Sequence, residues 1–186
     1  DFLERLHLAQ RLDTLADDLR REGRGALAAE YAQLWELTVG ALEQFAAISQ
    51  AAGSRSDYVQ GGGGNTSVKL ADGLMAIKAS GYCLSDIRPD KAYAVLDYEA
   101  LRRFYYGNEP AQLADVEKLG SACAKENTKL IEGMDALRPS VEAGFHSILK
   151  TFVCHTHSVY ANLAACSTAC CEIAEQAFTG ADYTWG

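Results

Sequence analysis

The sequence predicts an α/β sandwich with substantial antiparallel strand pairing. Two strand-like segments, 68–70 and 74–78, flank an Asp72-Gly73 turn, and this pattern is typical of a β-hairpin. Strand and helix segments also alternate without the regular βαβ order of a parallel sheet. The chain has 186 residues and 48% hydrophobic content, which suits one domain with a sizeable core.

The N-terminal quarter is predicted to form two helices. Residues 2–22 carry leucines at helical spacing, and Gly23 and Gly25 are expected to break this helix. The expected buried side of the second helix consists of Leu27, Tyr31, Leu34, Leu37, Leu42 and Phe45. We expect a helical hairpin that covers a sheet edge by packing, with substrate or partner recognition as the alternative. Residues 1–50 are therefore assigned to a helical extension packed on the core, and residues 51–186 to the main domain.

Two glycine-containing loops are expected at neighbouring strand ends. Four glycines at 61–64 precede Asn65-Thr66-Ser67, and Ala79-Ser80-Gly81 follows the second strand of the hairpin. The hairpin register would place residues 63–67 beside residues 78–81. Because glycines allow positive φ and close approach, backbone amides can converge on an anion. The first loop could bind phosphate or be a plain hairpin connection, and its spacing excludes a Walker A loop.

The remaining elements are shorter. In chain order, we predict a strand over 94–97, a helix over 98–106, a polar helix over 111–132, a helix that begins at Glu142, a strand that carries His155 and His157, and a last helix over 162–178.

A carboxylate lies a short way before two histidines. On a strand, His155 and His157 point to the same face, and Cys154 points to the other. Two imidazoles that converge on one point are a common way to hold Zn²⁺ or a related divalent ion. Glu142 would stand near that ion and move a proton, whereas His146 is expected to have a packing or supporting role. The alternative is a structural histidine pair with a solvated glutamate.

Composition excludes several functional classes. The net charge of −8 argues against nonspecific binding to nucleic acid or to an anionic membrane. No run of about 18 apolar residues is present, so no membrane span is expected. Six cysteines without a CxxC pair are expected to be mostly buried, small apolar residues in a reducing cytoplasm. Lys69 and Lys78 are expected to be surface charges.

The order of four short motifs is more specific than any one of them. Gly64-Asn65-Thr66-Ser67, Ser80-Gly81, Pro139-Ser140-Val141-Glu142 and His155-Thr156-His157 follow one another as in the class II aldolase/adducin family, which the chain resembles from about Tyr58 to its end. This resemblance implies a three-layer α/β/α sandwich with a central, largely antiparallel sheet. The family includes sugar-phosphate aldolases, ribulose-5-phosphate 4-epimerase and the non-catalytic head of adducin.

The resemblance also implies residue roles. His155 and His157 would be two of three histidine ligands to Zn²⁺ or another divalent metal, and Glu142 would be the acid/base. The phosphate of a sugar substrate would be held by Gly64, Asn65, Ser80, Gly81 and Ser140. By family analogy, the protein would be a homo-oligomer, commonly a tetramer.

The sequence departs from the family pattern in three places. No histidine follows His157, so we expect a piece of a longer protein with the third ligand beyond Gly186. Val141 stands where the fuculose aldolase has a second serine, and the segment between Glu142 and His155 is shorter than in that enzyme.

The expected function is cleavage of a ketose 1-phosphate to dihydroxyacetone phosphate and an aldehyde. An epimerase or a decarboxylase on the same fold is an alternative, because both reactions also pass through an enolate. A non-catalytic, adducin-like interaction module and a phosphate-ligand sensor are alternatives from other classes.

Overall fold

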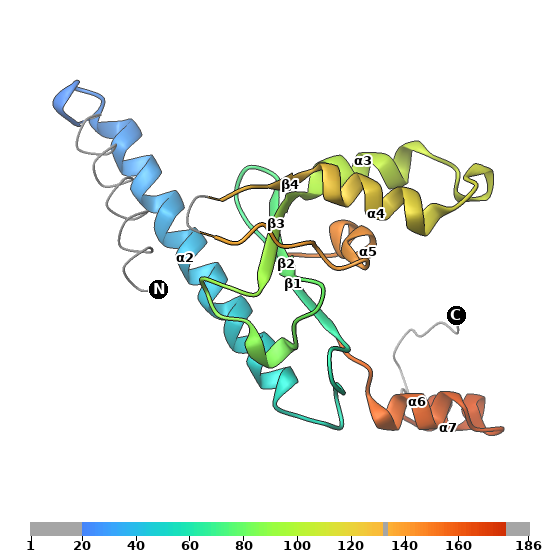
Figure 1. Cartoon of the computed structure of the whole chain (residues 1–186). Coiled ribbons are helices and arrows are strands. Elements are labelled where there is room, and N and C mark those ends of the chain that lie inside the picture. Colours follow the sequence, from blue (N-terminus) through green and yellow to red (C-terminus); the bar gives the residue numbers. More distant parts are fainter. Residues whose placement is uncertain (1–19, 132–133, 178–186) are drawn as a thin grey trace.

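In a computed structural model of the chain, residues 20–131 and 134–177 are described, and most of their helices lie on two sides of an antiparallel sheet (Figure 1). The strand order is β4-β3-β2-β1-β5, and every neighbouring pair is antiparallel. The strands are β1 (Asn65–Lys69), β2 (Leu74–Lys78), β3 (Tyr93–Asp97), β4 (Thr128–Lys129) and β5 (Phe152–His155). The predicted mixture of helices with an antiparallel sheet is confirmed.

The helices lie before, between and after the strands. They are α2 (Gly25–Gly53), α3 (Tyr98–Gly107), α4 (Val116–Glu126), α5 (Ala143–Ile148), α6 (Val159–Ala165) and α7 (Cys170–Ala177), with short 3₁₀ helices η1 (Leu84–Asp86) and η2 (Pro110–Gln112). Within the described ranges, no helix is long and apolar enough to cross a membrane.

The predicted hairpin joins β1 and β2. Asp72 and Gly73 both have positive φ, 55° and 72°, as a type I′ turn requires. Ser67 pairs with Ile77, so the glycine loop before β1 lies beside the loop after β2, as predicted. Strand β1 begins at Asn65, three residues earlier than predicted, because this end of β1 pairs with β5.

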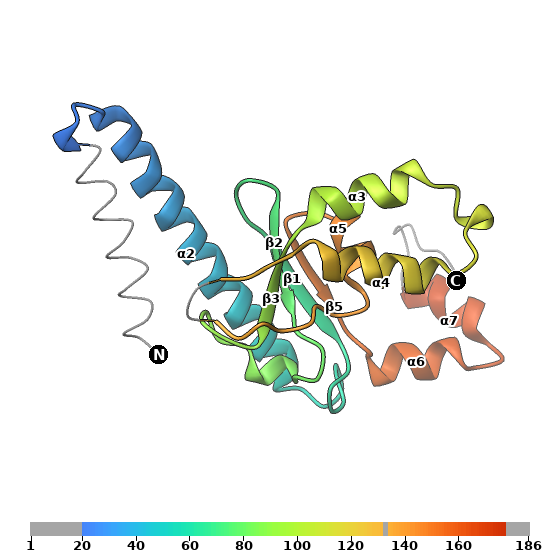
Figure 2. The ribbon, with the colours of Figure 1, turned by 45° about the horizontal axis from the view of Figure 1, so that its top comes forward.

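Helices α2 and α3–α5 lie on opposite sides of the sheet (Figure 2), which separates two apolar clusters. Successive residues along a strand point to opposite faces of the sheet. On one face, strand residues that include Val68, Ala76 and Val95 pack with Phe45 and Ala46 of α2. On the other face, the cluster joins β2 and β3 to α3, α4 and α5 through Met75, Ile77, Leu96, Leu101, Ala124 and Ala143.

Helix α2 differs from its prediction in two respects. The helix begins at Gly25, directly after the predicted break, but it covers a face of the sheet through its C-terminal half, not an edge. Leu37, predicted to be buried, is 64% exposed. The side chains of Tyr31 and Leu34, and residues 2–19 of the first predicted helix, lie outside the described parts. The boundary at residue 50 stays a prediction.

Two later helices are shorter than predicted. Asp115 caps α4, since its carboxylate accepts a hydrogen bond from the Lys118 amide at 2.9 Å, and the helix ends at Glu126. After Asn127, Thr128 and Lys129 form β4, a strand that the sequence interpretation missed. The predicted last helix is two helices, α6 and α7, and Phe178 lies outside the described residues.

The cysteines are free thiols, but they are not mostly buried as predicted. Cys154, Cys166 and Cys171 are exposed, and the other three are half-buried. Three exposed thiols lie in β5, α7 and the turn after α6, where no apolar cluster covers them.

Candidate metal centre

Glu142, His155 and His157 converge at the end of β5. Each offers one ligand atom, and these atoms lie within 4.8 Å of one another. Strand β5 ends at His155, so His157 lies beyond the strand and not in it as predicted. The two imidazole rings are nevertheless neighbours, with centroids 4.9 Å apart. Glu142 is the residue just before α5, so the predicted helix begins one residue later than expected.

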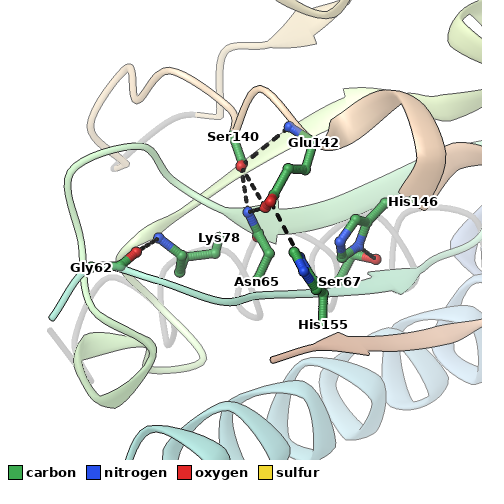
Figure 3. Close-up of polar contacts among 8 residues, drawn as sticks. All are labelled: Gly62, Asn65, Ser67, Lys78, Ser140, Glu142, His146 and His155. Atoms are coloured by element: carbon green, nitrogen blue, oxygen red, sulfur yellow. Dashed lines mark hydrogen bonds and ion pairs between the residues drawn. The ribbon is translucent and has the colours of Figure 1, made fainter. Parts of the chain in front are cut away.

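Hydrogen bonds from two other segments hold the Glu142 side chain (Figure 3). Nδ2 of Asn65, at the start of β1, donates to Oε2 of Glu142 at 2.6 Å and also to Oγ of Ser140. The Ser140 hydroxyl in turn donates to Oε2 of Glu142 at 3.4 Å. The second carboxylate oxygen, Oε1, lies 3.2 Å from Nδ1 of His155. The carboxylate is therefore fixed between β1, the segment before α5, and β5.

This environment favours the ionised form of Glu142. Burial by itself raises the pKa of the carboxyl group, but the Asn65 hydrogen bond and the nearby His155 and His146 outweigh it and hold the pKa below its ordinary value. The carboxylate is thus ionised at neutral pH. That form is required both to ligate a metal and to accept a proton.

Unpartnered polar atoms test whether a metal suits this site. Among the described residues, Nδ1 of His155, Oδ1 of Asn65 and Nε2 of His146 are buried without a hydrogen-bond partner, and the first two lie at this site. His155 faces Glu142 at ion-pair distance, but not with hydrogen-bond geometry. A buried polar atom without a partner costs about 1–3 kcal/mol, so a ligand here would be stabilising. Imidazole nitrogens with a carboxylate oxygen are a donor set that Zn²⁺ accepts, and the residues fit a divalent metal.

The glycine loop lies against both histidines. A Cβ on Gly63 would lie 2.9 Å from Nδ1 of His157. A Cβ on Gly64 would lie 2.5 Å from Cγ1 of Val59 and 3.0 Å from the carbonyl oxygen of His155, and Gly64 has a φ of +71°. A side chain at either position would clash with these atoms, so both positions require glycine. A phosphate-binding role for Gly64 stays a prediction.

The second predicted loop lies beside the segment that carries Ser140. Ala79 forms a bridge with Pro139, and the Ser80 amide donates to the Arg138 carbonyl oxygen at 2.9 Å. Gly81 is exposed, has a φ of +92° and has open space beside it. The structure thus brings the predicted phosphate-binding residues onto adjoining segments, and their binding of phosphate stays a prediction.

Two cations beside these loops were missed as site residues. Lys78 is only 4% exposed, so the prediction of a surface charge is wrong. Its Nζ donates to the carbonyl oxygens of Tyr82 at 2.7 Å and Gly62 at 3.3 Å, which links the two glycine loops, and burial lowers its pKa. Arg138 donates to Oγ of Ser80 at 2.8 Å. Their places in the sequence could have indicated a role in the site, because Lys78 lies just before Ser80-Gly81 and Arg138 lies just before Ser140.

His146 has the buried, supporting position that was predicted. It is fully buried, and its Nδ1 lies 2.7 Å from Oγ of Ser67. Burial lowers the pKa of His146 to about 4, so the ring is neutral at neutral pH.

The chain matches one family model and is similar to solved structures. The family model described as the class II aldolase and adducin N-terminal domain matches residues 43–184. Among solved structures, the chain is similar to the N-terminal class II aldolase domain of a conserved protein from Thermoplasma acidophilum, at 20% identity and a TM-score of 0.60, over 72% of this chain and 62% of that one. It is also similar to YgbL from Klebsiella pneumoniae, named as a candidate aldolase, epimerase or decarboxylase, at 20% identity and a TM-score of 0.46, over 70% of this chain and 50% of that one.

The chain therefore spans about half to six-tenths of the length of these two proteins. No curated protein matches it significantly.

Proposed function

Because the chain belongs to the class II aldolase and adducin N-terminal domain family, we propose that it is a metal-dependent aldehyde-lyase that cleaves a ketose 1-phosphate to dihydroxyacetone phosphate and an aldehyde. The observation that carries this proposal is the convergence of Glu142, His155 and His157 next to the glycine loop. A purely structural histidine pair would not need an ionised carboxylate beside it.

His155 and His157 would hold Zn²⁺ or another divalent metal, and Glu142 lies close enough to be a further ligand. When bound, such a metal supplies positive charge that polarises the substrate carbonyl group and stabilises the negative charge left by C–C cleavage. The unpartnered Nδ1 of His155 supports this assignment.

Glu142 would exchange a proton with the carbon that loses its C–C bond. Its lowered pKa makes it a base at neutral pH, and Asn65 and Ser140 fix the direction of its oxygens. A carboxylate held by hydrogen bonds needs little reorganisation before it reacts, and this lowers the entropic part of the barrier.

The phosphate of the substrate would lie among Gly64, Asn65, Ser80, Gly81 and Ser140. Two observations support this placement. Gly81 lies beside open space at the protein surface, and two cations, Lys78 and Arg138, border the same loops. Guanidinium and ammonium groups are the usual partners of phosphate, and they would offset the charge of an acidic protein.

Further proposals concern the location, assembly, partners and layer architecture of the protein. We expect a cytoplasmic homo-oligomer, a tetramer by family analogy, that acts on a phosphorylated sugar and binds neither nucleic acid nor a membrane. The net charge of −8 supports the absence of nucleic-acid and membrane binding, and the six free thiols support a reducing compartment. The two apolar clusters on opposite faces of the sheet support a three-layer α/β/α sandwich.

The test is retro-aldol turnover by the full-length protein over a panel of phosphorylated ketoses, with Zn²⁺ and after chelation. We expect metal-dependent release of dihydroxyacetone phosphate, about one metal ion per chain, and loss of turnover in Glu142→Gln and His155→Ala. Product analysis separates cleavage from epimerisation and decarboxylation. Metal-loaded protein that converts none of these substrates would contradict the proposal and favour an adducin-like interaction module.

A further inference from the structure

Three polar residues of β1 face the segment that contains Glu142. Asn65, Ser67 and Lys69 are spaced two residues apart, so they point to the same face of the sheet. Thr66 and Val68 between them point to the other face, toward α2. A row of three polar side chains on one strand face is unusual inside a protein, because each must find a partner there.

Each of the three contacts a different part of the α5 segment. Asn65 bonds Ser140 and Glu142 at its beginning, and Ser67 bonds the His146 ring in its middle. Lys69 reaches its end, where Nζ donates to the carbonyl oxygens of His146 at 3.0 Å and Lys150 at 2.8 Å, and also to that of Leu149.

Helix α5 depends on such contacts. It has six residues, whereas isolated helices shorter than about 12–15 residues are marginal in water. Its first residues receive no side-chain cap, because the Glu142 side chain turns to Asn65 and His155. The last carbonyl groups of a helix need donors from elsewhere, and a cation also opposes the negative end of the helix dipole. Lys69 meets both needs.

We propose that Lys69 is a positioning residue, which fixes the C-terminal end of α5 to β1 and thereby fixes Glu142 at the other end against Asn65. The inference rests on the proposed function, because it assigns Lys69 a role toward the proposed acid/base.

The stiffness of β1 connects the contact of Lys69 with α5 to the position of Glu142. Because a strand rises about 3.3 Å per residue, β1 holds Asn65 and Lys69 about 13 Å apart. The helix is bound at both of these points, so its position along the strand is fixed. Arg102 of α3 also donates to the end of α5, to the Ser147 carbonyl oxygen at 2.9 Å, but Arg102 does not lie on the strand that binds Glu142.

The Lys69 head group is drawn into the protein and not free in solvent. Burial, with the charge of Arg102, lowers the pKa of Lys69 to about 8. Its ammonium group also lies 5.2 Å from the centroid of the Tyr98 ring. The prediction of a surface charge at this position is therefore wrong.

The experiment uses metal-free full-length protein. In Lys69→Met, which keeps the stem and removes the donor, we expect backbone amides of residues 143–150 to exchange about tenfold faster. We also expect the Asn65 side-chain amide NMR signal, assigned through Asn65→Asp, to move in the direction seen in Glu142→Gln. Lys69→Arg should restore most of both readouts. Lys129→Met, which changes an exposed lysine on β4, is the matched control and should change neither.

An unchanged Asn65 signal in folded Lys69→Met would overturn the inference, even if exchange in α5 becomes faster. If Lys69→Met does not fold, amide exchange of the wild-type protein tests the inference instead. Wild-type α5 amides that exchange as fast as those of exposed loops would also overturn the inference. Failure of the proposed function is a separate result. An inactive wild type whose Asn65 signal responds to Lys69→Met would sink the aldolase proposal and leave the positioning role intact.

Discussion

The two faces of strand β1 are built differently. Toward α2, Val68 lies in an apolar cluster with Phe45, and a hydroxyl pair joins Thr66 to Ser49. Toward α5, the same strand presents an amide, a hydroxyl and an ammonium group, each of which bonds the segment that carries Glu142. One face therefore stabilises the fold mainly by burial of apolar area, and the other fixes the position of a proposed reactive group by hydrogen bonds.

This difference predicts separable effects of mutation. Changes on the α2 face should lower the free energy of unfolding and leave the chemistry of surviving molecules intact. Changes on the α5 face should alter the site more than the fold, because a hydrogen bond contributes only about 0.5–1.5 kcal/mol net. The variants below test that separation, beginning with the largest expected effect.

Glu142→Gln should lower turnover about 10²–10⁴-fold, because the amide cannot exchange a proton with the substrate. Its carbonyl oxygen can still accept the Asn65 hydrogen bond, so the free energy of unfolding should change by less than about 1 kcal/mol. Steady-state kinetics and urea unfolding check the two effects.

Glu117→Gln, an exposed position in the first turn of α4, is the matched control and should keep both turnover and stability. A Glu142→Gln protein with wild-type turnover would remove this residue from the proposed mechanism.

Phe45→Ala tests the face of β1 that packs against α2. Phe45 is 1% exposed and packs edge-on against Tyr93, with ring centroids 5.7 Å apart. Loss of a buried phenylalanine typically costs about 3–5 kcal/mol, so thermal or urea unfolding should show a large loss of stability. Metal affinity of the folded fraction should stay near that of the wild type.

Leu37→Ala on the same helix should change stability by less than about 0.5 kcal/mol, because that side chain is 64% exposed. Equal losses for the two variants would contradict the burial assigned to α2.

Short-range patterns predicted much of the fold. The hairpin was predictable because Asp72-Gly73 determines a turn with positive φ, and α3 because its apolar spacing is regular. Strand β4 was missed because two residues carry no period, and its pairing with β3 is a long-range contact. The burial of Leu37 was wrong because periodicity gives the apolar side of a helix but not how far the sheet extends beneath it.

The site was predicted unevenly for a similar reason. The His-x-His spacing with a carboxylate upstream, and the order of the four motifs, suggested Glu142, His155 and His157, which the structure brings together. Lys69 and Lys78 were predicted as surface charges, because the sequence does not show that backbone carbonyl oxygens of residues 146–150 accept from Lys69, or that those of Gly62 and Tyr82 accept from Lys78. The hydrogen-bond partners of these two ammonium groups depend on how the chain folds.

The α5 face should also be the acid-sensitive one. Burial lowers the pKa of His146 to about 4, below its ordinary value of about 6.5. The unfolded state therefore binds more protons between these values, and the free energy of unfolding should fall as pH drops from 6.5 to about 4, by about 2–3 kcal/mol. Urea unfolding in a chelating buffer at several pH values measures this.

His146→Gln, whose amide can still bond Ser67, should flatten the profile in that window. An unchanged slope in His146→Gln would show that another group is responsible for the acid sensitivity.

The smallest effect concerns the hydroxyl pair on the α2 face. Oγ of Ser49 donates to the Phe45 carbonyl oxygen at 2.6 Å, so in the 2.7 Å contact with Thr66 it is the threonine that donates. Ser49→Ala leaves the buried Thr66 hydroxyl without an acceptor and should cost about 1–2 kcal/mol. Adding Thr66→Val removes that unpaired hydroxyl, so the double variant should be less destabilised than the sum of the single variants in a double-mutant cycle. Strict additivity would mean that the pair is not coupled, and that apolar packing alone aligns α2 with β1.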